Sequence, residues 1–331
     1  MRIRTGALMR AVTAACTGLA VVHASGCVHA QGAAQFPNKP VKTVLPFGPG
    51  GVADVTMRLV AGKLSERIWQ QFVIENKPGA GAINAAMTVK SATPDGYTLL
   101  LNGNGSALSA SLFKSLPFDI AKDFTQISVL AQFDVLLAVK TDGEIDSIKT
   151  FVEVAKAKPG KLNLGTVAAG STQNLAAEMF KVVTGIEAAI VTFRTTPDLV
   201  TALMRGDVQV GFDYLAAFSS GVQDNKLKII AAGGEKRSPL TPNVPTVVES
   251  GWPEYVVTSW NGISAPAGTP NDIVVKLSRE INAVLKLPDV QMRSTQLGME
   301  AVGSTPDGMT KRLNDDIVRW RGIITKLGLQ K

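Results

Sequence analysis

Two glycine turns carry the residues of this chain that are best suited to chemistry. The first has the sequence Pro46-Phe47-Gly-Pro-Gly50-Gly51-Val-Ala-Asp54 and separates an apolar run from a stretch of helical periodicity. Adjacent glycines at a helix start let a ligand approach the main chain, and the unpaired first amides together with the helix dipole favour an anion. Because no lysine follows the glycines, the turn does not match a nucleotide-binding P-loop.

The second turn has the sequence Gly165-Thr-Val-Ala-Ala-Gly170-Ser171-Thr172 and also lies between an apolar run and a helical pattern. Ser171 or Thr172 can cap the following helix. Either turn alone is a weak signal, because many α/β proteins place a glycine turn between a strand and a capped helix without binding anything there. Two such turns that face each other across a cleft could hold both ends of one anion.

Polar residues after two other apolar runs are further candidates. Asn102, with Asn104 and Ser106, follows such a run at the position where α/β proteins place ligand groups, but all three could be turn residues. Asp213 ends another run and has the same two explanations.

Three other features also have two interpretations. Asp54 suits the first turn of a helix on electrostatic grounds alone, by a few tenths to about 1 kcal/mol, or it contacts a ligand. Phe47 abuts the glycines and could form a pocket wall. The run at residues 79–84 partly matches a dinucleotide fingerprint, but it lacks the third glycine and follows a turn signal, so we assign it to loop-to-helix geometry.

The chain has little capacity for nucleophilic, metal or dithiol chemistry. Both histidines, His23 and His29, and both cysteines, Cys16 and Cys27, lie in the first 30 residues. That segment has the basic start, the short apolar centre and the small terminal residues of a cleavable export signal. Its removal after about Ala30 would exclude Ser/His/Asp and Cys/His catalysis, the usual zinc ligand sets and redox dithiols. We therefore expect no cofactor and no bound metal.

The same segment predicts the location of the protein. Its apolar centre is shorter than the about 20 residues that a membrane span needs, and nothing further along the chain is apolar enough. We expect a soluble periplasmic protein. Lipidation at Cys27 is the alternative to cleavage near Ala30, but Ala24 stands three positions before the cysteine, where a larger aliphatic residue is usual.

Composition argues against a nucleic-acid partner. The 331-residue chain has a formal net charge of +7, and removing a 30-residue signal with its three arginines leaves 301 residues and +4. The basic residues are scattered and only 6% of residues are aromatic, so neither a basic run nor a set of stacking residues is present. A chain of this length can form one large or two ordinary domains.

The elements that must position the two turns alternate along the chain. Strands are predicted at residues 41–47, 71–75, 97–101, 135–139, 162–166, 189–193, 208–212 and 227–231. Helical periodicity separates them, as in residues 52–68 and 175–183. This alternation predicts an α/β fold with parallel-rich sheets that helices cover on both faces.

The C-terminal part breaks the alternation. Three helices are predicted there, at about residues 271–285, after Pro288 and at about residues 306–327, with Ser304 or Thr305 as the cap of the last. They have no sheet of their own to cover, so we expect them to pack on the N-terminal domain. The predicted organisation is a signal peptide at residues 1–30, a discontinuous domain 1 at residues 36–133 plus 261–331, and a domain 2 at residues 134–260, with two extended segments as the hinge.

Short motifs are spread over nearly the whole mature chain. They are Phe36-Pro-Asn-Lys-Pro40, Pro46-Phe-Gly-Pro-Gly-Gly51 with Asp54, Glu75-Asn-Lys-Pro-Gly-Ala-Gly81, Pro94-Asp-Gly-Tyr-Thr-Leu99, Leu116-Pro-Phe-Asp119 with Asp123-Phe124, Lys158-Pro-Gly-Lys161, Gly170-Ser171, Pro242-Asn-Val-Pro-Thr-Val247, and Trp260 with Pro266-Ala-Gly-Thr-Pro270. In this order they resemble the Bug-type, TctC-like receptors of tripartite tricarboxylate transporters. Each motif is short, but their number and order make the resemblance specific.

The resemblance implies a two-domain periplasmic binding protein of the type II, or Venus-flytrap, architecture. In such receptors the turn matching residues 47–54 binds one carboxylate of a small di- or tricarboxylate or amino acid, mostly through main-chain amides and bridging waters. The turn matching residues 166–172 lines the opposite wall. The implied partners are a small carboxylate and the membrane permease subunits of a tripartite tricarboxylate transporter. We expect a monomer without enzymatic activity.

Three positions depart from the family pattern. Asn174 stands where a histidine is common, so binding should lack the pH dependence that an imidazole confers. Ala168 stands where glycine is frequent, and Phe193-Arg194-Thr195 replaces a frequent Tyr-Lys-Gly. Arg194 could bind a carboxylate in a bidentate manner, or it could be an exposed arginine at a helix end.

The resulting hypothesis is a receptor that binds a carboxylate in a cleft. The predicted ligand-binding residues are Phe47, Gly50, Gly51, Val52, Ala53, Asp54, Asn102, Thr166, Ala168, Gly170, Ser171, Thr172, Asn174, Arg194 and Asp213. The alternative is a carboxylate-dependent hydrolase or lyase on the same scaffold, with an acid and base such as Asp54 and Asp213, although no motif sets two carboxylates at a diagnostic spacing. A secreted adaptor that binds only protein is a third possibility, which the two turns disfavour.

Overall fold

The computed structural model describes residues 36–330. The chain divides into two units, Met1–Phe36 and Pro37–Lys331, and the fold described here is that of the second. The predicted signal peptide, its cleavage near Ala30 and the lipidation at Cys27 lie outside the described residues. In the described part, no helix combines the length and the apolar composition that crossing a membrane would require.

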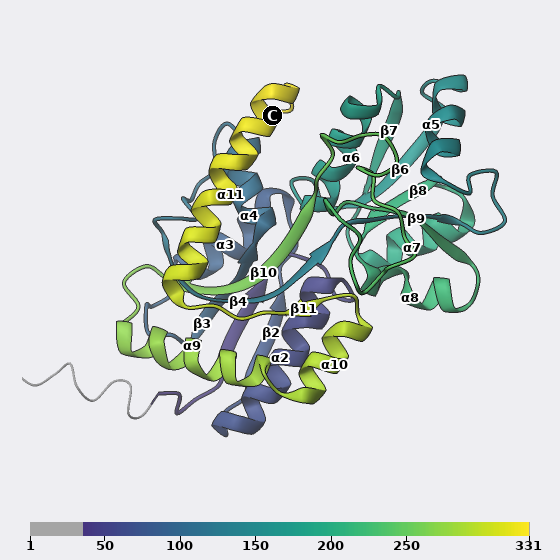
Figure 1. Ribbon diagram of the computed structural model, residues 1–331. Helices are drawn as coiled ribbons and strands as arrows, with labels where there is room; N and C mark the ends of the chain where they lie inside the picture. The colour runs from purple at the N-terminus through teal and green to yellow at the C-terminus, as the bar shows by residue number, and fades with distance from the viewer. Residues whose placement is uncertain (1–35, 331) are drawn as a thin grey trace, which may run out of the picture. The chain divides into compact units, whose positions relative to one another are not determined.

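Two sheets form the framework of this unit, and each supports one lobe (Figure 1). The strands of lobe 1 are β1 (Val41–Leu45), β2 (Phe72–Asn76), β3 (Thr98–Gly103), β4 (Phe124–Asp134), β10 (Thr258–Pro266) and β11 (Glu300–Ala301). The strands of lobe 2 are β5 (Leu136–Lys140), β6 (Leu162–Val167), β7 (Ala188–Phe193), β8 (Val210–Asp213) and β9 (Leu227–Ala232). The strand orders are β11-β4-β10-β3-β1-β2 and β7-β6-β8-β5-β9.

Each sheet has a parallel group with antiparallel strands beside it. The groups β2-β1-β3 and β7-β6-β8 are parallel, whereas β10, β4 and β11, like β5 and β9, pair antiparallel. All eight predicted strands are present, each within two residues of its predicted ends, and the strands missing from the prediction are β4, β10 and β11. The predicted α/β class is therefore confirmed.

Helices cover both faces of each sheet (Figure 1). Lobe 1 has α2 (Val52–Ile68), α3 (Ile83–Lys90), α4 (Asn104–Leu112), α9 (Asn271–Leu285), α10 (Pro288–Gln296) and α11 (Pro306–Leu327), with the short 3-10 turn η1 (Ala80–Ala82). Lobe 2 has α5 (Ile148–Ala157), α6 (Thr172–Thr184), α7 (Thr196–Arg205) and α8 (Leu215–Gln223). As predicted, the C-terminal helices return to lobe 1, where α9 and α11 contact β4. Thr305 caps α11 by accepting a hydrogen bond from Gly308 N at 3.0 Å.

Apolar side chains pack the helices of lobe 2 against its sheet. On one side of the lobe 2 sheet, Phe151 stacks on Phe180 with ring centroids 5.5 Å apart. On the other side, Leu199, Leu203 and Phe218 are fully buried. Burial of one such side chain contributes about 1.5–3 kcal/mol, so the loops at the sheet edge start from a rigid scaffold.

The chain crosses between the sheets twice, and the two crossings touch. Val135 alone separates β4 from β5, and residues 233–257 lead back from β9 to β10. Gly233 N donates to Val135 O at 2.7 Å, and Gly233 O accepts from Val257 N at 2.7 Å. A Cβ at residue 233 would lie 2.6 Å from Val257 O, so a side chain there would push the crossings apart. These crossings form the predicted two-segment hinge; the domain boundaries at residues 133 and 260 remain a proposal.

Candidate ligand-binding site

Both glycine turns line one cavity between the lobes. The cavity lies where loops lead from β1, β3 and β6 into α2, α4 and α6. The non-atom space in the cavity is about 750 Å³, part of it open to solvent. The predicted binding residues that line it are Phe47, Gly51, Val52, Ala53, Asn102, Ala168, Gly170, Ser171, Thr172 and Arg194.

The start of α2 offers main-chain amides that no other described residue uses. Its N-cap is Gly51, which has no side chain to cap the helix, and the first intrahelical bond is that of Val55 N to Gly51 O at 3.0 Å. The N–H groups of Val52 and Ala53, both cavity residues, therefore have no acceptor among residues 36–330. Unpaired amides at the positive end of this 17-residue helix attract an anion.

Glycine is needed at residue 51 because the other lobe comes close. A Cβ on Gly51 would lie 2.9 Å from Thr196 Oγ1 at the start of α7. The uncapped helix start and the close approach of the lobes thus depend on the same residue.

The start of α4 is a second uncapped helix end; Asn102, Asn104 and Ser106 were candidates there, but no helix start was predicted. Its N-cap, Gly103, makes no side-chain cap, and Gly103, Gly105 and Ser106 line the cavity. The signal was present in the sequence, since Asn102-Gly-Asn-Gly places two glycines directly after a strand.

Side chains occupy part of the first turn of α6. Ser171 Oγ accepts from Asn174 N at 3.1 Å and donates to Val167 O at 2.7 Å. Asn174 accepts from Gly170 N at 3.3 Å and donates to Thr166 Oγ1 at 3.4 Å. Thr166 and Asn174 are not among the cavity residues, and they brace the turn from behind.

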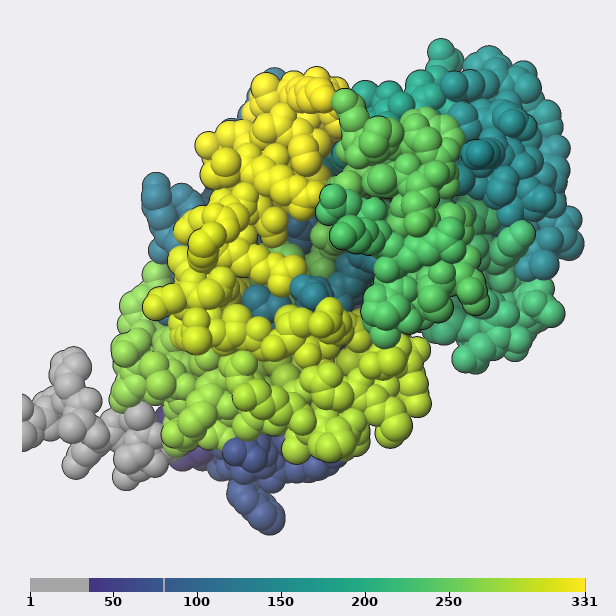
Figure 2. Space-filling view, viewed as in Figure 1, coloured from purple at the N-terminus to yellow at the C-terminus, as the bar shows by residue number. Residues whose placement is uncertain are grey.

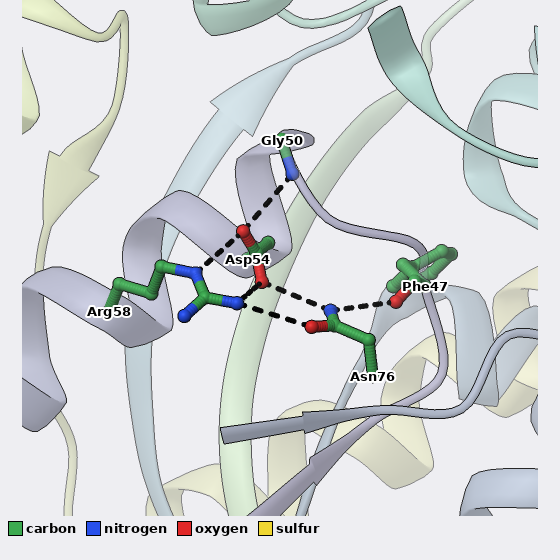
Figure 3. A network of polar contacts seen from close by, with 5 residues as sticks. All are labelled: Phe47, Gly50, Asp54, Arg58 and Asn76. Carbon is green, nitrogen blue, oxygen red and sulfur yellow. Dashed lines mark hydrogen bonds and ion pairs between the residues drawn. The ribbon is translucent and has the colours of Figure 1, made fainter. Parts of the chain in front are cut away.

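Asp54 lies behind the first turn and fixes its shape (Figure 3). Its buried carboxylate accepts from Gly50 N at 3.1 Å, from Arg58 Nε at 2.9 Å and Nη2 at 2.8 Å, and from Asn76 Nδ2 at 3.0 Å. Asn76 also donates to Phe47 O at 3.0 Å. Burial alone would raise the pKa of Asp54, but the hydrogen bonds from Arg58, Gly50 and Asn76 outweigh burial and lower it. Neither Gly50 nor Asp54 lines the cavity, and the Gly50 N–H is already used.

Asp213 has a similar place behind the wall of lobe 2. It is fully buried and accepts from Gln173 Nε2 at 3.0 Å, Thr196 Oγ1 at 2.9 Å and Tyr214 N at 2.9 Å. Burial raises the pKa of Asp213, and these three donors oppose that shift. Gln173, Thr196 and Tyr214 line the cavity while Asp213 does not, so its carboxylate orients the lining.

Arg194 brings a positive charge to the cavity. Its side chain is exposed at the end of β7, and in the part of the chain that the structure describes it forms neither an ion pair nor a side-chain hydrogen bond. The charge is therefore free to meet an anionic ligand.

The lobes contact each other around the cavity. Asn104 Nδ2 donates to Thr172 Oγ1 at 2.9 Å, Ser109 Oγ donates to Gly170 O at 3.2 Å, and Gly81 N donates to Ala169 O at 3.3 Å. Gly79, Gly81 and Ala82 are cavity residues. The run at residues 79–84, which we assigned to loop-to-helix geometry, thus also forms part of the wall.

Several other lining residues had no sequence signal as binding residues. Ser259 and Asn261 belong to β10, a strand that was not predicted, and Gln173, Thr196 and Tyr214 reach the cavity through tertiary packing. Tyr214 hydrogen-bonds to Ser259 and Thr172, and burial raises its pKa.

A second and larger hollow lies on the hinge side. Figure 2 shows it between the yellow C-terminal segment and a green segment of lobe 2, and its space open to water centres is about 400 Å³. Its lining includes the carboxylates of Asp134 and Glu300 and the C-terminal half of α10. The two carboxylates carry negative charge, and the end of a helix carries a partial negative charge. The guanidinium in this hollow is that of Arg312, which already lies over the Trp260 ring and donates to Gln132. The cavity at the helix starts is the better anion site.

Among the described residues that line the site, no catalytic set is recognisable. Among residues 36–330, no group of three or more His, Cys, Asp or Glu side chains is placed to hold a metal ion. The two carboxylates considered for acid and base catalysis, Asp54 and Asp213, both lie outside the cavity lining. The arrangement is suited to binding through main-chain amides, hydroxyls and one guanidinium.

Comparison with known proteins agrees with this assignment. The family model described as "Tripartite tricarboxylate transporter family receptor" matches residues 56–329. A solved structure of Rpa4515 from R. palustris with adipate is 31% identical with a TM-score of 0.84, and the match covers 88% of this chain and 98% of that one. MatC from Rhodopseudomonas palustris with bound malate is 29% identical with a TM-score of 0.82, covering 87% and 100%. The periplasmic binding protein BugD is 28% identical with a TM-score of 0.85, covering 89% and 100%.

These relatives are solute-binding receptors and not enzymes. The resemblance found in the sequence motifs and the two-domain fold are both confirmed. The chain belongs to the TctC family of periplasmic solute-binding receptors of tripartite tricarboxylate transporters.

Proposed function

We propose that this protein captures a small carboxylate of the di- or tricarboxylate or amino acid type between its lobes. It then delivers the ligand, as a monomer, to the membrane permease of a tripartite tricarboxylate transporter. The observation that carries this proposal is the uncapped start of α2, where the Val52 and Ala53 amides line the cavity and have no acceptor among the described residues. One ligand carboxylate occupies this position.

The rest of the cavity supplies what a second anionic group needs. The start of α4 is also uncapped, and Arg194 has no acidic partner in the described chain. Relatives of about 30% identity that were solved with adipate and with malate support a dicarboxylate. Of the predicted binding residues, Gly50, Asp54, Thr166, Asn174 and Asp213 act as supports behind the lining.

A proline at residue 52 tests the role of the amide directly. Gly51 is extended, with φ −84° and ψ 171°, which suits the residue before a proline, and the first helical position tolerates proline. Val52→Pro therefore removes one donor and leaves α2 able to form. A lost hydrogen bond to a charged group is worth about 1.5–3 kcal/mol, so we expect carboxylate affinity to fall roughly 10- to 150-fold.

Isothermal titration of ligand-stripped protein with a panel of small carboxylates and amino acids measures this loss. Asn271→Pro, at the first position of α9, is the matched control and should bind like the wild type. If no panel member gives saturable heat with the wild type, or if Val52→Pro binds as tightly, carboxylate capture at α2 is wrong. Uptake into vesicles that contain the permease subunits, with and without this receptor, tests delivery.

A further inference from the structure

The cavity contains a buried acceptor that no described residue satisfies. Asn102 lines the cavity at the end of β3 and is 2% exposed. Its Nδ2 donates to Gln126 Oε1 at 3.0 Å, whereas its Oδ1 has no hydrogen-bond partner among residues 36–330. A buried polar atom without a partner is costly, and a bound molecule that supplies the partner recovers that cost.

The orientation of the Asn102 amide is fixed by groups outside the cavity. Gln126 Nε2 donates to the carbonyls of Ile120 at 3.2 Å and Phe124 at 3.3 Å. Main-chain carbonyls can only accept, so this end of Gln126 must be its nitrogen and the other end its oxygen. That oxygen requires a donor, which is Asn102 Nδ2. Asn102 Oδ1 is therefore left as an acceptor without a partner, on a residue that lines the cavity.

The wall of lobe 2 also offers hydrogen-bond acceptors to the cavity, for a separate reason. Gln173 Nε2 and the Thr196 hydroxyl both donate to the buried carboxylate of Asp213. Each then offers acceptors, Gln173 Oε1 and the Thr196 lone pairs, while Gln173 Nε2 keeps one further N–H, and both residues line the cavity. The lining thus offers acceptors on both lobes, together with the donor amides of α2 and the unpartnered Asn261 Nδ2.

We infer that the natural ligand carries a hydroxyl or ammonium donor in addition to its carboxylates, and that Asn102, Gln173 and Thr196 recognise this donor. The inference rests on the proposed function. An unsubstituted dicarboxylate has only acceptors at neutral pH, so it would leave Asn102 Oδ1 unpaired and bring oxygen against oxygen. A hydroxy- or amino-dicarboxylate satisfies the acceptors while its carboxylates take the amides and Arg194.

Ligands that share a carbon skeleton test this inference without any mutation. Isothermal titration would compare succinate with malate and aspartate, glutarate with glutamate, and adipate with 2-aminoadipate. We expect a donor-bearing member to bind at least about tenfold tighter than its unsubstituted counterpart, which corresponds to about 1.4 kcal/mol. If the unsubstituted member binds equally or more tightly on every skeleton, the inference is overturned and carboxylate capture stands. If nothing binds, the proposed function fails, and this inference fails with it.

Gln126→Leu tests the orientation argument, because Gln126 does not line the cavity. Without Gln126 the Asn102 amide can turn its nitrogen toward the ligand, so the preference for a donor-bearing ligand should fall at least threefold. Gln291→Leu is the matched control: Gln291 also donates to two carbonyls, those of Leu285 at 2.6 Å and Ala301 at 3.0 Å, and it lies outside this cavity. An unchanged preference in folded Gln126→Leu contradicts the argument. If that variant does not fold, Thr196→Val, which keeps the shape and removes the hydroxyl, applies the same test to lobe 2.

Discussion

Replacing Asp54 by asparagine tests whether the network behind the first turn controls stability and affinity together. Oδ1 accepts from Arg58 Nη2 and Asn76 Nδ2, and Oδ2 accepts from Gly50 N and Arg58 Nε. In Asp54→Asn, whichever oxygen becomes the amide nitrogen faces two donors. The variant also removes the charge that Arg58 pairs with.

The structure sets the size of the effect. Hydrogen bonds to charged groups contribute about 1.5–3 kcal/mol each, but the Arg58 side chain is 53% exposed, so its share must be reduced for solvent screening. We expect a loss of about 2–3 kcal/mol in the free energy of unfolding. At roughly 2–4 °C per kcal/mol for a chain somewhat shorter than this one, Tm should fall by about 5 °C or more. Gly50 loses its acceptor if the amide nitrogen replaces Oδ2, and Asn76, which also holds Phe47 O, loses one if it replaces Oδ1. In either case the turn loses a bond that fixes the α2 amides, and carboxylate affinity should fall about tenfold.

Urea unfolding and isothermal titration measure the two effects. Asp307→Asn is the control: Asp307 is exposed in the first turn of α11, so only about 0.3–1 kcal/mol of helix-dipole stabilisation is at stake. A double-mutant cycle with Arg58→Met should give a coupling of about 1–2 kcal/mol. A coupling near zero, or lower stability with unchanged affinity, would refute the claim that Asp54 positions the ligand-binding amides.

Three further expectations concern pH, the hinge and the cavity cation. Because the pKa of Asp54 is lower in the folded than in the unfolded state, its stabilisation should be complete above about pH 4 and disappear as the pH falls through the folded pKa; the difference between wild type and Asp54→Asn in urea unfolding should shrink accordingly. Gly233→Ala should cost about 1–3 kcal/mol because its Cβ meets Val257 O, whereas Gly62→Ala, within α2 and with open space around its Cβ, should stabilise by about 0.5–1 kcal/mol. Arg194→Met should weaken carboxylate binding about tenfold and reduce the salt dependence of the affinity in titrations at several salt concentrations, with Tm unchanged.

The strands that could be predicted are those whose composition is simple. Runs such as residues 136–140 and 188–193 are mostly apolar, contain Val, Ile or Thr and are followed by polar turn residues, so local pattern is sufficient. β10 contains Asn261, Gly262 and Pro266, which favour turns, and it is a strand because β3 and β4 pair with it on both sides. β4 mixes polar residues into an 11-residue strand that is buried almost throughout. Tertiary pairing determines both strands, and no window of sequence contains it.

Local sequence is also insufficient to predict which single residues of the site face the ligand. That residues 50–54 begin a helix with free amides follows from local sequence. Which of these groups faces a ligand does not follow from it, because the Gly50 N–H is already bonded to Asp54 whereas Gly51 lines the cavity. Asp54 and Asp213 were chosen for their chemistry, but each is surrounded by donors from distant segments that draw it behind the lining.

The hinge limits how the lobes can move. The crossings are bonded to each other at Gly233, and β4 pairs with β10 as far as Asp134 and Thr258. Two bonded strands resist stretching and shear but bend and twist readily, so the relative motion of the lobes is confined to a few soft modes. We therefore expect ligand capture to follow bending and twisting at these strands, and a set of distances between labels on the two lobes would report both.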